Sequence, residues 1–357
     1  MATTTNPGFT RDEVGLALRN PGMPLEALRR PVTPAGMHYV LVHFDVPDLD
    51  AAAYELRVDG RVRAPLSLTL DDLRARPAVT VPIVMECAGS GRARLTPRPV
   101  SAPWHDDAVG CAEWTGTPLR GLLEQAGLAD DALEIVFTGH DRGVDQGVEQ
   151  DYQRSLTIDD AVRDDVLLAY AMNGAPLPPQ HGFPLRLLVP GWYGMASVKW
   201  LRSITAVAEP FDGVQQTVLY RYRREADEAG EPVTRQRPKA LMAPPGIPEF
   251  LTRTRHVQAG RTRVEGRAWS GAGAIARVEF SADGGRTWAD ARLDPPPGGH
   301  GWTGWSVDWD ATEPGDHELC VRATDATGET QPLDAGDAWN QGGYGVNAVQ
   351  RVAVRVA

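Results

Sequence analysis

The last third of the chain consists of short alternating segments, and this pattern limits the fold more than any other feature of the sequence. TRVEGRAWSG, ARVEFSADGGRTW, GWTGWSVDWDA and HELCVRATDATG each alternate apolar with polar residues, and glycine-containing turns separate them. Alternation with a period of two is typical of strands, and strands at regular, turn-punctuated intervals are typical of a β-sandwich. We therefore predict that the C-terminal part is an all-β, immunoglobulin-like sandwich.

The part before the sandwich mixes strand and helix patterns. VTVPIVMEC, from Val79 to Cys87, is a β-branched run typical of a buried strand. LRGLLEQA lies between Pro118 and Gly127, the residue types that favour a helix start and a helix end. The segment from Asn6 to Asp50 is rich in Pro, Gly and Asp, and we interpret it as a loop that wraps the first domain.

A proline-rich segment separates the mixed part from the alternating part. Four prolines between Arg235 and Pro248 argue against a central strand or helix there, so we place the interdomain linker near them. The predicted fold class is α+β, with a mixed α/β domain over residues 1–235 and the sandwich over residues 236–357.

Charge and cysteine content narrow the possible partners and location. The 36 Lys and Arg face 47 Asp and Glu, and the net charge of −11 repels nucleic acid and anionic lipid. An anionic ligand therefore needs a local basic pocket. Three scattered cysteines suit a reducing compartment, no apolar run approaches the ~20 residues of a membrane span, and the first residues resemble no secretory leader. We predict a cytoplasmic protein.

Cys87 and a downstream basic cluster are the candidates for chemistry. Cys87 ends the predicted buried strand and enters a loop of small residues followed by Arg92, where a thiolate could hold a soft or high-valent metal. Taken alone, Cys87 is more simply an inert buried thiol. His181, Arg186 and Lys199, in HGFPLR and VPGWYGMASVKWL, form a plausible cradle for a phosphate and a polar ring system.

Acidic residues between the predicted strands suggest a second, weaker site. Asp106, Asp141, Asp145 and Glu149 could form a carboxylate site, but we interpret them as solvated loop charges.

With these residues assembled, the sequence resembles the sulfite oxidase family of molybdopterin-dependent oxidoreductases, which includes the molybdenum domain of plant nitrate reductase. The resemblance covers nearly the whole chain. It rests on MECAGSGRA, GCAEWTGTPL, LLAYAMNGAPLPPQHGFPLRLLVPGWYGMASVKWL and WSGAGAIARVEFSADGGRTW, which occur in the family's order. It implies a molybdopterin-binding domain followed by a sandwich that forms a homodimer.

The resemblance also assigns roles to individual residues. It implies that the cofactors are molybdenum and molybdopterin, and that Cys87 is the protein's thiolate ligand to the metal. His181, Arg186 and Lys199 match the positions that hold the pterin and its phosphate.

Three further residues match positions around the reacting centre. His43 corresponds to the family's histidine beside the cofactor, Arg92 to the arginine of the loop after the ligand cysteine, and Tyr220 to the active-site tyrosine. The resemblance implies that they orient a small anionic or polar substrate.

Two departures from the family pattern bear on the substrate. Leu41 stands two residues before His43, where sulfite-oxidising members usually carry an arginine, and Ala274 stands where we align another arginine of the vertebrate enzymes. We rank oxidation of sulfite or a related sulfur compound first. Reduction of an S-oxide, N-oxide or oxyanion stays open, as does a non-catalytic binding protein that kept the fold.

The electron acceptor has to come from outside the chain. The sequence has no CxxCH haem-attachment motif, no cluster-binding cysteine set and no flavin fingerprint. We therefore predict an external acceptor, a cytochrome or another one-electron acceptor.

Overall fold

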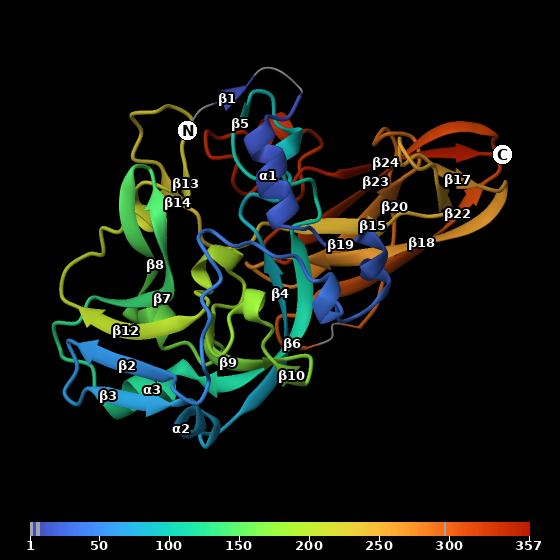
Figure 1. Cartoon of the computed structure of the whole chain (residues 1–357). Coiled ribbons are helices and arrows are strands. Elements are labelled where there is room, and N and C mark those ends of the chain that lie inside the picture. Colours follow the sequence, from blue (N-terminus) through green and yellow to red (C-terminus); the bar gives the residue numbers. More distant parts are fainter. Residues whose placement is uncertain (1–2, 5–7, 296–297) are drawn as a thin grey trace.

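The computed structural model describes residues 3–4, 8–295 and 298–357, and these form two packed bodies (Figure 1). Sheets and short helices form the first body, and the sandwich forms the second, with the C-terminus at its far end. Residues 6–7 of the predicted N-terminal loop, and residues 1–2 and 5 before it, lie outside the described residues. None of the described helices is both long and apolar enough to cross a bilayer.

A five-stranded sheet carries the predicted metal-binding cysteine. Its order is β10-β9-β6-β4, with β11 also paired to β9. The apolar run predicted as a buried strand is β4, and its last four residues are all buried. The strands are β4 (Val79–Glu86), β6 (Val109–Pro118), β9 (Leu167–Met172), β10 (Ala175–Pro176) and β11 (Arg186–Leu188).

A second five-stranded sheet, of order β3-β2-β12-β7-β8, lies beside the first. β12 pairs in parallel with β2 and antiparallel with β7. The apolar faces of these strands enclose a core that includes Phe137, Leu156 and Ile204. The strands are β2 (Glu55–Gly60), β3 (Leu66–Thr69), β7 (Glu134–Asp145), β8 (Val148–Thr157) and β12 (Leu201–Val207).

Short helices cover these sheets or connect their strands. The predicted helix between Pro118 and Gly127 is α3, which buries four of its apolar side chains. The helices of the first body are α2 (Leu70–Arg74), α3 (Leu119–Ala126), α4 (Ile158–Ala161) and α5 (Val214–Thr217). Two-stranded ribbons pair β1 (Thr3–Thr4) with β5 (Arg98–Pro99) and β13 (Arg221–Tyr222) with β14 (Glu231–Pro232).

The C-terminal body confirms the predicted sandwich. Its two sheets have the orders β15-β18-β22-β21 and β16-β17-β24-β23-β19-β20. Alternate residues of both sheets point inward, and Val264, Trp305 and Val321 are among those in the core. The strands are β15 (Lys239–Ala243), β16 (Ile247–Pro248), β17 (Arg255–Val257), β18 (Gly260–Trp269), β19 (Ile275–Ser281), β20 (Ala289–Asp290), β21 (Arg292–Leu293), β22 (Thr303–Ala311), β23 (Gly315–Asp325) and β24 (Gln350–Val356).

Two predictions along the chain are wrong. The linker predicted between Arg235 and Pro248 contains β15, which is buried throughout and pairs with β18. Its flanking prolines bracket the strand instead of interrupting it. The loop predicted for residues 6–50 contains α1 (Arg11–Arg19), which begins with a capping box between Thr10 and Glu13.

The two bodies share a buried junction. Leu28, from the N-terminal segment, packs with Val109 of the first body and with Trp269 and Trp302 of the sandwich. Because this core draws on both bodies, the N-terminal segment fastens them together and does not wrap the first domain alone.

The segment before β24 of the sandwich also contacts the loop after Cys87. The Gly345 backbone N–H donates to the carbonyl of Ala88 at 2.7 Å, and a side chain at Gly91 would collide with the carbonyl of Val346. We call residues 343–346, which lie over this loop, the strap.

Candidate active site

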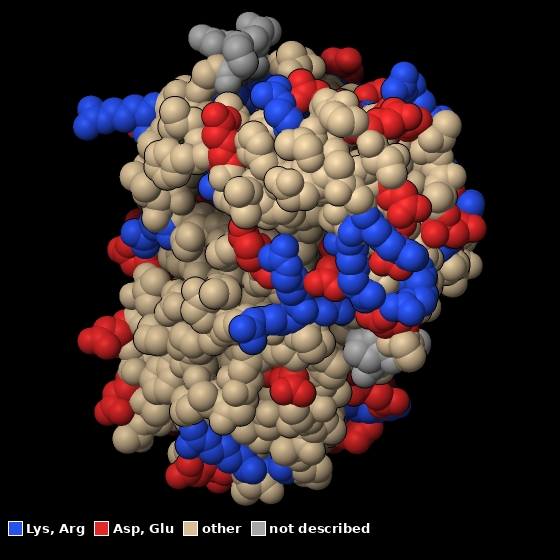
Figure 2. All heavy atoms as spheres, turned by 90° about the vertical axis from the view of Figure 1, so that its right-hand side faces the viewer, with Lys and Arg blue, Asp and Glu red and all other residues tan. Residues whose placement is uncertain are grey.

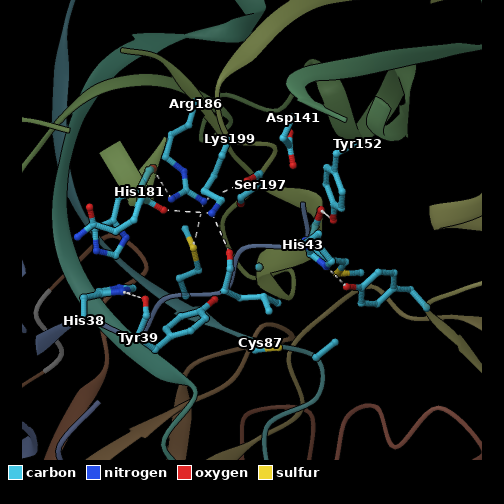
Figure 3. Close-up of a pocket in the computed structure, with 17 residues that line it drawn as sticks. His38, Tyr39, His43, Cys87, Asp141, Tyr152, His181, Arg186, Ser197 and Lys199 are labelled. Carbon is cyan, nitrogen blue, oxygen red and sulfur yellow. Dashed lines mark hydrogen bonds between the residues drawn. The ribbon is translucent and has the colours of Figure 1, made fainter. Parts of the chain in front are cut away.

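One cavity brings together six of the seven predicted site residues (Figure 3). The cations gather on one side, His43 and Tyr152 lie on the other, and Cys87 lies below them. The predicted residues that line the cavity are His43, Cys87, His181, Arg186, Lys199 and Tyr220.

Cys87 follows the last residue of β4, so the buried strand delivers its sulfur to the cavity. The Gly89 backbone N–H donates to Sγ at 3.4 Å. Burial raises the pKa of the Cys87 thiol, and the positive charge of Arg92 opposes that rise. A metal ion would displace the thiol proton, because the thiolate is the form that binds metals.

Arg92 is the predicted site residue that does not line the cavity. It is buried under the loop after Cys87, and a Cβ at Gly89 would lie 2.8 Å from its guanidinium. Glycine therefore lets the ligand loop rest directly on this cation. The guanidinium also lies 5.3 Å from the ring centroid of Tyr344.

The basic side of the cavity is formed by His181 at the end of a short helical turn, Arg186 at the start of β11 and Lys199 just before β12. Arg186 donates to the carbonyls of His181 at 2.9 Å and Ser197 at 3.0 Å, and Lys199 donates to those of Leu41 at 2.7 Å and Gln180 at 3.1 Å. Burial lowers the pKa of Arg186 to about 10 and that of Lys199 to about 7.

A glycine makes this close approach possible. Gly182 has a φ of +107°, and a Cβ there would lie 3.1 Å from the Cβ atoms of both Arg186 and Lys199.

His43 and Tyr220 form the opposite side. The Tyr220 hydroxyl and His43 Nε2 are hydrogen-bonded at 2.6 Å, and the ring of Tyr152 stacks on His43 at 4.6 Å. Burial lowers the pKa of His43 to about 4 and raises that of Tyr220 well above its usual value. Tyr220 adopts a φ of +52°, a region that non-glycine residues rarely occupy and that is enriched at functional sites.

Several lining residues were missed at the sequence level. His38, Tyr39 and Tyr152 gave no motif signal, because each lies in an ordinary loop or strand pattern. The prediction that Asp141 is a solvated loop charge is wrong. It is buried, is the one carboxylate among the described residues lining the cavity, and burial raises its pKa to about 6.

Ala274 does not bear on this cavity. It lies between β18 and β19, along a separate hollow that also includes Trp269 and His300. The predicted loss of a cation at Ala274 therefore has no effect on the charge around Cys87. Leu41 does line the cavity, so that departure stands.

His38 gives the apoprotein a predicted pH dependence. Burial lowers its pKa in the folded state to about 4 from about 6.5. As the pH falls, the unfolded chain takes up this proton first, so the stability contributed by neutral His38 is present above pH 6.5 and is lost between pH 6.5 and 4. Urea unfolding should show a loss of about 2 kcal/mol from this group by pH 5. His38→Gln should lower the pH dependence by that amount, and an unchanged slope would contradict the assignment.

The residues present fit a phosphate-bearing pterin and a metal held by one protein sulfur. Nε of buried Arg186 and Nε of buried Arg92 have no hydrogen-bond partner, as expected of cations arranged for an anionic group. Within the described ranges, no three His, Cys, Asp or Glu side chains gather into a metal site.

Family models account for both bodies. Residues 43–215 match the model described as oxidoreductase molybdopterin binding domain, and residues 243–357 match the Mo-co oxidoreductase dimerisation domain. Sulfite oxidase of Gallus gallus is 35% identical over 89% of this chain and 72% of its own length. The chain belongs to the sulfite oxidase family. It is a molybdopterin-dependent oxidoreductase, and its cofactor is the molybdenum cofactor.

Other members of the family cover the chain to a similar extent. NADH nitrate reductase of Hordeum vulgare is 33% identical over 91% of this chain, which spans 38% of that protein. Mitochondrial sulfite oxidase of Homo sapiens is 33% identical over 91% of this chain, which spans 62% of it. Among solved structures, the sulfane dehydrogenase SoxCD from Paracoccus pantotrophus matches with a TM-score of 0.80 and 28% identity, covering 94% of this chain and 86% of that chain.

Proposed function

We propose that this sulfite oxidase family member oxidises sulfite or a related sulfur compound and passes the electrons singly to an external acceptor. The observation that carries the proposal is the charge of the cavity. Arg186 and Lys199 line it, Arg92 lies directly beneath its ligand loop, and Asp141 is the one acidic side chain among the described lining residues. A buried excess of positive charge favours an anionic substrate in addition to the cofactor phosphate.

The proposed roles follow from position. Cys87 would hold the metal, while His181, Arg186 and Lys199 would hold the pterin and its phosphate. When bound, the cofactor supplies oxygen-atom transfer and two-electron redox chemistry. Sulfite and water then give sulfate, two electrons and two protons.

His43 and Tyr220 would handle the proton at the substrate end. At neutral pH the phenol keeps its proton and the imidazole is uncharged, because burial shifts their pKa values in those directions. In the tautomer whose Nε2–H donates to the Tyr220 oxygen, the single O–H of Tyr220 stays available to donate to a substrate oxygen, and the hydrogen bond from His43 fixes the direction of the phenol. The side chain of Tyr152, stacked on His43, holds the imidazole in place.

The function is tested on holoenzyme from a host that makes the cofactor. We expect about one molybdenum per chain by elemental analysis and turnover of sulfite with an artificial one-electron acceptor. Thiosulfate, a neutral sulfoxide and nitrate serve as comparison substrates. Efficient reduction of the sulfoxide or of nitrate with a dye donor, without oxidation of sulfite, would favour the alternative reductase. Absence of all turnover in molybdenum-loaded protein would favour a binding protein.

The dimer proposed for this chain makes use of an exposed apolar patch on the sandwich. Ile247, Phe250 and Leu251 are 71%, 84% and 85% exposed and lie together at the start of the dimerisation-domain match. Figure 2 shows uncharged surface between groups of charged side chains on this end of the molecule. Such apolar groups mark interaction sites, and two-fold pairing is the commonest assembly.

The patch leads to a prediction about assembly. Sedimentation should give about twice the chain mass of 38.7 kDa. Phe250→Asp with Leu251→Asp should shift the protein to monomer, since two charges would be buried in the interface. Leu18→Asp on α1, also 81% exposed, is the matched control and should remain dimeric. A dimer that survives the double change would place the interface elsewhere.

The cytoplasmic location stays a prediction.

A further inference from the structure

Arg154 is a buried cation beside the cavity to which neither the sequence motifs nor the proposed roles assign a function. It lies on β8, two residues after Tyr152, and residues two apart on a strand share a face. The Tyr152 ring lines the cavity, so Arg154 is on the strand face that looks toward it. Only 4% of the Arg154 surface is exposed.

The charge of Arg154 has no acidic partner in the described structure. Its Nη1 donates to the carbonyl of Gln215, and its Nε has no hydrogen-bond partner. Two other buried cations of the described residues are paired with acids, Arg98 with Glu13 and Lys239 with Glu86. Within the same described ranges, Arg92, Arg186 and Arg255 share with Arg154 the lack of such a partner. A buried guanidinium without a counter-charge attracts an anion where a cavity lies close to it, and Arg154, unlike Arg255, lies next to a cavity-lining side chain.

Arg154 belongs to a row of four side chains, of which Tyr220 lines the cavity. Its guanidinium lies 5.5 Å from the ring centroid of Tyr220, which stacks on Tyr344 at 5.0 Å. Arg92 lies 5.3 Å from the other ring of this pair. Two tyrosines thus stand between two buried cations, and Tyr220 presents its hydroxyl to the cavity beside His43.

We propose that Arg154 determines the charge specificity of this enzyme by attracting and positioning a small oxyanion at the Tyr220 end of the cavity. The inference rests on the proposed function in that it names the residue that selects an anionic substrate. Leu41, which lines the same cavity, carries no charge, so this end depends on cations from other elements. Among the described residues, Arg154 on β8 and Arg92 under the ligand loop are the two cations that contact the tyrosine pair, just behind the cavity wall that Tyr220 forms.

The test compares Arg154→Gln, Arg154→Lys and wild-type holoenzyme, each normalised to its molybdenum content. Arg154→Gln should raise KM for sulfite and the inhibition constant of sulfate by about 10- to 100-fold, the size of one lost charge-assisted contact. Its kcat should change much less. Arg154→Lys keeps the charge, so its sulfate affinity should stay within a few-fold of the wild-type value.

A matched control separates anion recognition from folding. Arg255 on β17 is also a buried arginine, and it donates only to backbone carbonyls of residues 244–246. Arg255→Gln should lower the thermal midpoint without changing KM or sulfate affinity. If Arg154→Gln behaves in the same way, losing stability with unchanged anion affinity, Arg154 is structural and the inference is wrong.

The design also distinguishes this inference from the proposed function. If wild-type holoenzyme does not oxidise sulfite, the proposed function fails, and sulfate binding measured by calorimetry still decides the role of Arg154. A drop in sulfate affinity for Arg154→Gln but not for Arg154→Lys supports the inference, and equal affinity in all three proteins overturns it. Should Arg154→Gln not fold, a folded Arg154→Lys that has lost sulfate affinity entirely would overturn it as well.

Discussion

Replacing Cys87 by serine is expected to lower turnover by more than about 100-fold and to remove most of the bound molybdenum. Residues that merely support a metal ligand typically cost 10- to 100-fold when changed, so loss of the ligand itself should cost at least as much. A hydroxyl is a harder and much less acidic donor than a thiol, and the site offers no other cysteine among the residues lining the cavity. Elemental analysis per chain and turnover with an artificial acceptor measure the two effects.

Cys111 provides the matched control for this change. It is a free, fully buried thiol on the neighbouring strand β6, opposite Val84. Cys111→Ser should lower stability yet retain metal and turnover, because its sulfur does not line the cavity. Full metal content and full activity in Cys87→Ser would show that the cofactor does not depend on this sulfur.

Replacing Lys239 by methionine is expected to destabilise the folded protein by about 3–5 kcal/mol. Lys239 on β15 donates to Glu86 at 3.1 Å and to Ser90 at 3.2 Å, and Trp269 donates to the same carboxylate at 2.9 Å. Lys239 and Glu86 are both buried. Without the ammonium, Glu86 would hold an uncompensated charge, and burial already raises the pKa of that carboxyl. Urea unfolding of single and double variants measures the loss.

The double variant Glu86→Gln, Lys239→Met distinguishes a charge effect from a packing effect. Removing both charges should restore most of the stability, since a buried ion pair is itself of little net worth. The exposed pair Arg355 and Asp316 is the surface comparison, and Arg355→Met should leave unfolding almost unchanged. If Lys239→Met is no more harmful than Arg355→Met, the junction does not rely on this pair. Because Glu86 precedes Cys87, we also expect reduced cofactor retention in Lys239→Met.

Sequence patterns predicted the parts of this molecule that depend on local chemistry. The β-branched run ending at Cys87 forms the buried strand β4, and the alternating segments form the two sheets of the sandwich. The resemblance to the family supplied seven site residues, and the fold brings six of them to one cavity. In each case the signal was a short motif or a period, which a single sequence can display.

The parts that could not be predicted depend on neighbours from distant segments. Asp141 and Arg154 resemble ordinary charged residues of a polar hairpin, and only the packing of β7 and β8 against the Tyr220 segment buries them. β15 lies between prolines and is a strand because β18 pairs with it along its whole length. The helix α1, by contrast, has a local signal, the capping box of Thr10 and Glu13. The loop prediction gave more weight to the prolines and glycines around it.

The strap has a consequence for how this protein can be recombined. Residues 343–346 lie near the very end of the chain, yet they cover the loop that follows Cys87. A chimera that joins residues 1–235 to the sandwich of a relative would therefore replace the strap that covers the loop after Cys87. Crossover sites between members of the family should therefore keep the loop and the strap from the same parent. The two bodies then have to be exchanged together for the site around Cys87 to stay intact.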